Sequence, residues 1–76
     1  MNDTVKSIMA KVFRTDIKNI TEDLNQKDVV FWDSLRHLNL IVELEEKFDV
    51  SFEPKEISEM VTFKKVIYYI NQKLAK

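Results

Sequence analysis

The chain has 76 residues, with 45% hydrophobic and 33% charged side chains, and a chain of this length forms one small core with little volume left for a deep substrate pocket. We therefore expect a single domain over residues 1–76 and do not expect an enzyme with a deep substrate pocket. A formal net charge of −1 does not provide the basic surface of a nucleic-acid-binding protein, and the lack of cysteine together with a single histidine argues against a disulfide or a metal site.

The composition favours helices throughout the chain. There is no glycine and only one proline, and the apolar residues recur at helical spacing. We expect an all-α fold: a four-helix bundle of three longer helices and one short helix, with a long ordered loop between the first two. No stretch approaches the roughly 20 apolar residues of a membrane span, and the N-terminus lacks the apolar segment of a signal peptide. We therefore expect a cytoplasmic monomer without a membrane span.

The first helix is expected over about residues 4–14, with Asp3 and Thr4 as candidate N-caps. Its apolar residues follow the i, i+3, i+4, i+7, i+8 pattern of one helix face: Val5, Ile8, Met9, Val12 and Phe13. Residues 15–33 show a weak apolar pattern, with single positions at Ile17, Ile20 and Leu24 and a run from Val29 to Trp32, which indicates a long loop. A connection of this length either counts against the helix assignment or marks a functional loop, and these residues leave both possibilities open.

The second helix, over residues 34–48, has the strongest pattern in the sequence. It is long and free of proline and glycine, and Asp33 precedes it as the expected N-cap. At about 100° per residue, one arc of the helix collects the residues expected to face the core: His37, Leu40, Ile41, Leu44 and Phe48.

A second apolar strip lies on another side of this helix and consists of Leu35, Leu38 and Val42. Acidic residues border the strip: Glu45, Glu46 and Asp49. Residues 43–59 hold seven acidic side chains and only two lysines. This arrangement is consistent with a solvated helix face, but the apolar strip favours a docking surface for a partner that presents apolar and basic groups.

Two further helices are expected near the C-terminus. Residues 54–60 form the short one, with Pro54 in its first turn. The last covers about residues 63–75, with Thr62 as its N-cap. Its apolar residues again share one face: Phe63, Val66, Ile67, Ile70 and Leu74.

Chemistry is most plausible at the start of the second helix, in the tripeptide Asp33-Ser34-Leu35. A serine at a helix start is often only a cap. A phosphate ester on its hydroxyl would instead lie beside unpaired N–H groups at the positive end of the helix dipole. A hydrolytic serine is excluded by the lack of an aligned base, because the one histidine, His37, lies toward the core.

The segment WDSLRHLNLIVELEEKFDVSF, followed by a short acidic segment and an apolar last helix, resembles the acyl carrier protein family of phosphopantetheine-binding domains. The resemblance covers nearly the whole chain and includes the long loop. It implies that Ser34 carries 4′-phosphopantetheine, transferred from coenzyme A by a phosphopantetheinyl transferase. The protein would then hold acyl groups as thioesters and present them to acyl-loading and acyl-using enzymes. Asp33 matches the family's acidic position before the serine, and Leu35 and Val42 match positions that meet partner enzymes.

The chain also departs from typical fatty-acid carriers. Phe31 and Trp32 stand where those carriers have a glycine, and the net charge is only −1. The pattern W-D-S-L-x-H-L is more similar to stand-alone carriers of polyketide, peptide or surface-polysaccharide pathways. We expect Trp32 and His37 to pack in the core; the alternatives are contact with the arm for Trp32 and a hydrogen bond to the phosphate or a pH-sensing role for His37. Arg36 is either solvated or a counter-charge for the phosphate. The alternative function is an unmodified helical module that docks partners through the acidic second helix.

Overall fold

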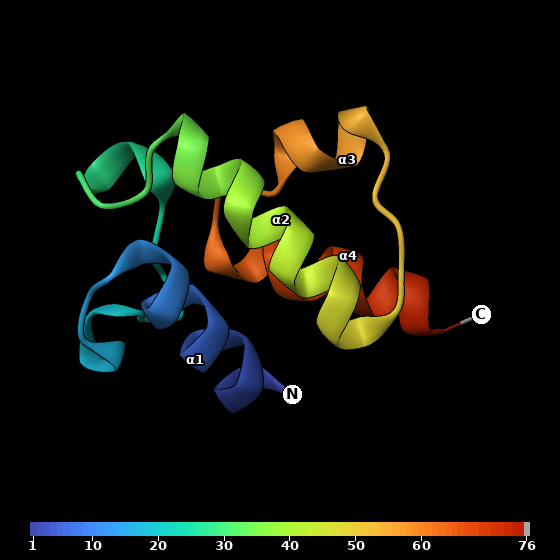
Figure 1. Cartoon of the computed structure of the whole chain (residues 1–76), viewed down its shortest axis with the longest axis horizontal. Coiled ribbons are helices and arrows are strands. Elements are labelled where there is room, and N and C mark those ends of the chain that lie inside the picture. The colour runs from blue at the N-terminus through green and yellow to red at the C-terminus, as the bar shows by residue number, and fades with distance from the viewer. Residues whose placement is uncertain (76) are drawn as a thin grey trace.

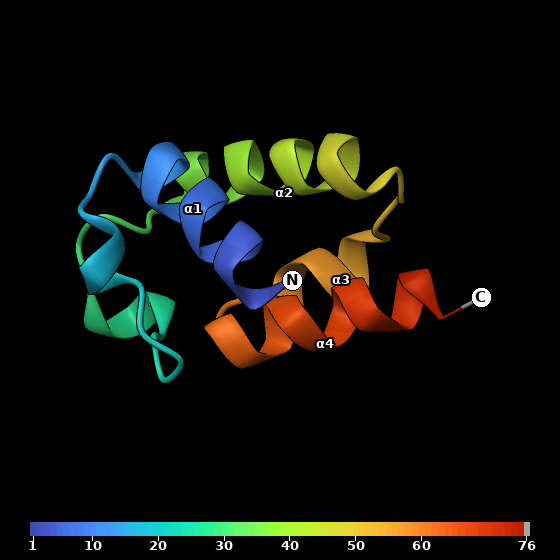
Figure 2. The ribbon, with the colours of Figure 1, turned by 90° about the horizontal axis from the view of Figure 1, so that it is seen from below.

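The computed structural model describes residues 1–75 and contains four α-helices and two short 3₁₀ helices within them. In chain order these are α1 (Asn2–Phe13), η1 (Ile17–Asn19), η2 (Gln26–Asp28), α2 (Ser34–Phe48), α3 (Pro54–Glu59) and α4 (Phe63–Leu74). The predicted all-α fold, with three longer helices and one short helix, is confirmed. Figure 2 shows α2 and α4 as two separate layers, and Figure 1 shows α1 on one side of α2 and α3 on the other.

The predicted bounds of α2 are confirmed, whereas those of three other helices were slightly wrong. The helix α1 was expected over residues 4–14 but begins at Asn2, because the backbone N–H of Val5 donates to the carbonyl of Met1 at 3.0 Å. Asp3 and Thr4 therefore lie in its first turn and do not cap it. The helices α3 and α4 each end one residue earlier than expected, at Glu59 and Leu74.

Two helices end in a left-handed residue although the sequence has no glycine. Arg14 follows α1 with φ 56°, and Asp49 follows α2 with φ 54°. At the end of α1, the N–H of Thr15 donates to the carbonyl of Ala10 at 3.1 Å. This bond reverses the chain direction and ends α1 before residue 14.

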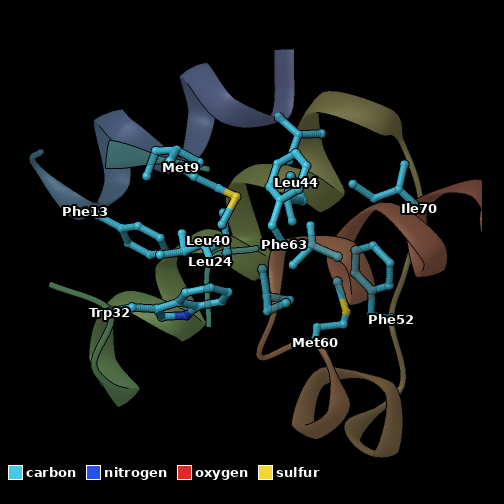
Figure 3. Close-up of a cluster of buried hydrophobic side chains, with 14 residues drawn as sticks. Met9, Phe13, Leu24, Trp32, Leu40, Leu44, Phe52, Met60, Phe63 and Ile70 are labelled. Atoms are coloured by element: carbon cyan, nitrogen blue, oxygen red, sulfur yellow. The ribbon is translucent and has the colours of Figure 1, made fainter. Parts of the chain in front are cut away.

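The buried core draws on every α-helix except α3 and on the long loop (Figure 3). Its members are Val5, Met9, Phe13, Ile20, Leu24, Trp32, Leu40, Ile41, Leu44, Phe52, Met60, Phe63, Val66 and Ile70. The loop is tied to the connection between α3 and α4 by two backbone bonds. Gln26 donates to Val61 at 2.9 Å, and Phe63 donates to Leu24 at 3.0 Å. The long loop is therefore a packed part of the fold, and its length does not contradict the helix assignment.

The short helix α3 has no buried residue of its own, and polar contacts hold it in place. Toward α4, the hydroxyl of Tyr69 donates to the carboxylate of Glu59, and the ammonium of Lys73 lies 2.9 Å from the carboxylate of Glu56. Toward α2, the carbonyl of Ile57 is bonded by a ring nitrogen of His37. Ile57 of α3 also packs, partly buried, against the core, so apolar contact adds to these polar contacts. No helix within residues 1–75 is long and apolar enough to cross a bilayer.

Candidate functional site

Ser34 is the first residue of α2, and its side chain is exposed. Asp33 precedes it in an extended conformation, and one Asp33 carboxylate oxygen accepts from the N–H of Arg36 at 2.8 Å. The predicted N-cap is thus confirmed. Because Asp33 caps the helix, the Ser34 hydroxyl is not needed for that structural role.

The surroundings of Ser34 suit an anion. The first-turn N–H groups of a helix have few intrahelical partners and lie at the positive end of the helix dipole. Arg36 follows Ser34 two residues later, and its Nη1 atom lies 3.6 Å from an Asp33 carboxylate oxygen. The two side chains are partly exposed, so the Arg36 guanidinium can also interact with another anionic group. A phosphate ester on Ser34 therefore fits the residues present.

An open pocket beside the serine provides room for a group larger than a phosphate. Its lining comes from η2, from the start of α2 and from the connection before α4: Asn25, Gln26, Lys27, Trp32, Asp33, Ser34 and Val61. Most of these residues carry hydrogen-bonding atoms, but most of the surface that they present to the pocket is apolar. Such a lining can contact the amides and the hydrocarbon of an elongated arm.

Two buried rings lie on the core side of this segment. Trp32 is only 2% exposed and His37 only 8%. The indole Nε1–H of Trp32 donates to Nδ1 of His37 at 3.0 Å, and Nε2 of His37 lies 2.8 Å from the carbonyl of Ile57. An indole nitrogen can only donate, so Nδ1 must accept and Nε2 must carry the hydrogen. We call these two bonds the Trp32–His37–Ile57 bridge.

The bridge confirms that Trp32 and His37 belong to the core. It also engages both ring nitrogens of the single histidine. A hydrolytic serine needs a base that accepts its proton through a free ring nitrogen. His37 does not present one to Ser34, because both of its ring nitrogens are bonded elsewhere.

The second apolar strip of α2 is exposed, as predicted. The exposed fraction is 69% for Leu35, 57% for Leu38 and 51% for Val42. Of the acidic residues beside it, Glu46 and Asp49 are exposed. Glu45 is half-buried, and its Oε2 accepts from the backbone N–H of Phe52 at 2.9 Å. This carboxylate therefore also holds the segment that follows α2.

Sequence reasoning missed the cations at the other edge of the strip. A groove along α2 is lined from that helix by Leu35, Arg36, Asn39, Val42 and Glu43, and from the end of α1 by Lys11, Val12 and Arg14. The basic residues near the end of α1 were visible in the sequence. Only the packing of α1 against α2 shows that they lie next to the strip. Within residues 1–75 no cluster of three or more histidine or acidic side chains could hold a metal ion.

Comparisons with known proteins agree on one family. The family described as "Phosphopantetheine attachment site" matches residues 3–70. An acyl carrier protein of Exiguobacterium sp. is 31% identical over 70 residues, covering 92% of this chain and 89% of the relative. An acyl carrier protein of Buchnera aphidicola is 31% identical over 72 residues, covering 95% and 91% of the two chains. The solution structure of a holo acyl carrier protein from Geobacter metallireducens superimposes with a TM-score of 0.85 at 31% identity, covering 97% of this chain and 85% of that one.

Proposed function

Because this chain belongs to the acyl carrier protein family, whose cofactor is 4′-phosphopantetheine, we propose that Ser34 is the attachment site and that residues 1–76 act as one carrier domain. The observation that carries the proposal is the exposed serine at the first position of α2, directly after an N-cap that Asp33 already provides. The pocket beside Ser34 supports it, because the arm needs space next to its point of attachment.

The proposed modification uses the Ser34 hydroxyl as the nucleophile. Its oxygen forms a bond to the phosphorus that carries the pantetheine half of coenzyme A, the bond from that phosphorus to the nucleotide half breaks, and the hydroxyl proton passes to a base on the transferase. The helix start and Arg36 stabilise the negative charge that remains on the phosphate. When bound, the cofactor supplies a thiol that holds acyl groups as thioesters.

Acyl carrier proteins work with a phosphopantetheinyl transferase and with enzymes that load and use acyl groups, and they are carriers, not catalysts. We propose that this chain meets those enzymes through the exposed strip of α2 and the acids beside it: Leu35, Leu38, Val42, Glu45, Glu46 and Asp49. Apolar contact would supply affinity, and the acids would attract basic partner surfaces and raise association rates. We expect no catalytic residue in the chain itself.

The pathway is proposed from the sequence around the serine. Trp32 and His37 form the buried bridge, which ties the W-D-S-L-x-H-L pattern to a structural feature of this chain. From the resemblance of this pattern to stand-alone carriers we propose a specialised polyketide, peptide or surface-polysaccharide pathway, with fatty-acid synthesis as the alternative. Cytoplasmic location and a monomeric state stay predictions.

Intact mass tests the attachment site directly. Purified protein is incubated with coenzyme A and a promiscuous phosphopantetheinyl transferase, and we expect wild type to gain the mass of one phosphopantetheine. Ser34→Ala should gain nothing while keeping its helical circular-dichroism spectrum, because Asp33 still caps α2. Ser51→Ala, at another exposed serine, is the matched control and should be modified like wild type. Modification of Ser34→Ala would refute the site. An unmodified wild type would favour the alternative of an interaction module.

A further inference from the structure

Trp32 and His37, which lie two residues before and three residues after Ser34, form a hydrogen bond with each other on the core side of the serine. Trp32 and His37 are both buried, and the bond between them closes a short loop of chain around the attachment position. Trp32 also packs against Phe13, with ring centroids 5.0 Å apart. Figure 3 shows Trp32 at one end of the core, with Phe13 and Leu24 close by.

Trp32 separates the pocket beside Ser34 from the interior. It lines that pocket together with Ser34, and it also belongs to the buried cluster through its contact with Phe13. A group that reached from the pocket into the core would have to displace this ring. Displacement would break the indole hydrogen bond to His37 and leave the indole N–H without its partner.

The same bridge crosses the space between α2 and α3. His37 belongs to α2, and its Nε2 donates to the carbonyl of Ile57 in α3 at 2.8 Å. Entry between these two helices would therefore also break a bridge bond. Entry through the pocket and entry between α2 and α3 would thus each break one of the two bonds.

A long hydrocarbon chain in water gains free energy in proportion to the apolar area that it buries. A carrier whose core is closed cannot bury a long hydrocarbon chain and does not gain this free energy. A short or polar acyl group would gain little from burial in any case. We propose that the Trp32–His37–Ile57 bridge keeps the core closed to the carried group, and that the cargo of this protein is a short or polar acyl group held outside the core. This inference rests on the proposed attachment at Ser34 and specifies its substrate class.

The test compares one series of loaded proteins. A promiscuous transferase loads wild type from acetyl-, butyryl-, octanoyl- and dodecanoyl-coenzyme A, and intact mass verifies each product. We then measure the melting temperature and the indole N–H resonance of Trp32, the one tryptophan in the chain. For wild type we expect melting temperatures within about 1 °C across the series and an unchanged indole resonance.

Two variants identify the bridge as the barrier. Trp32→Phe keeps an aromatic ring against Phe13 but removes the indole N–H and opens space next to Ser34. Its melting temperature should rise by several degrees from the acetyl to the dodecanoyl form. Ile70→Val opens space at the other end of the core in Figure 3 and should show no such rise.

The outcomes separate this inference from the proposed function. A wild-type melting temperature that rises with chain length, with a shifted indole resonance, overturns the inference. A flat series for both wild type and Trp32→Phe refutes the bridge as the barrier. If Trp32→Phe does not fold, the inference is tested by the wild-type series and by the melting temperatures of His37→Phe loaded with the same four acyl groups. Failure to load wild type from any of the four donors contradicts attachment at Ser34, and not the closed core.

Discussion

Replacing His37 with phenylalanine tests the bridge as a source of stability. Phenylalanine fills a similar volume but offers no ring nitrogen, so both bridge bonds are lost. The Trp32 indole is 2% exposed, and leaving such a buried donor unsatisfied costs about 1–3 kcal/mol. Losing the bond to the half-buried carbonyl of Ile57 adds about 0.5–1.5 kcal/mol. We expect His37→Phe to lower the free energy of unfolding by about 2–4 kcal/mol, which for a domain of this size corresponds to roughly 10–30 °C in melting temperature.

Urea unfolding followed by circular dichroism measures this loss. Asn39→Phe, at an exposed position of the same helix, is the control for placing phenylalanine in α2. The double variant Trp32→Phe/His37→Phe removes both ring partners. Because no indole N–H is then left unsatisfied, the double variant should lose about 1–2 kcal/mol less free energy of unfolding than the two single variants lose together. A His37→Phe protein within about 0.5 kcal/mol of wild type, or strictly additive costs, would refute the bridge as a stabilising unit.

Two further contacts give predictions of their own. Glu45→Ala removes the acceptor of the Phe52 N–H, so we expect a loss of about 1–2 kcal/mol in urea unfolding. Glu45→Gln, whose amide oxygen can still accept, should retain most of that stability, and equal losses in both would contradict the assigned contact. The hydrogen bond to the Glu59 carboxylate, with burial and nearby negative charge, raises the pKa of Tyr69 from 10.0 to about 12. The stabilisation that this hydrogen bond gives the folded state is fully present below pH 10. It is lost as the pH rises toward 12, because the phenol then loses the proton that it donates. Melting temperatures between these two pH values should therefore fall more steeply for wild type than for Tyr69→Phe, with Tyr68→Phe following wild type.

The features predicted correctly from the sequence depend on residues close together in the chain. The bounds of α2 followed from its periodic apolar residues and from Asp33, which bonds the N–H of a residue only three positions later. Ser34 stood out for the same local reason. The family and its cofactor, inferred from the segment around Ser34, are confirmed by the comparisons. The start of α1 was missed because the helix extends back to Asn2 with no side-chain cap, so no capping residue marks its first turn.

By itself, then, the sequence determined the helical class, the position of Ser34 at the start of α2 and the exposure of the strip beside it. Helix periodicity and capping involve residues within one or two turns of each other, so both can be recognised from the sequence alone. Only the tertiary structure decided that His37 bonds the carbonyl of Ile57, twenty residues away, and that Lys11 and Arg14 lie along the strip of α2. These contacts depend on how the helices pack against each other, and no local pattern specifies which distant carbonyl or cation a side chain will meet.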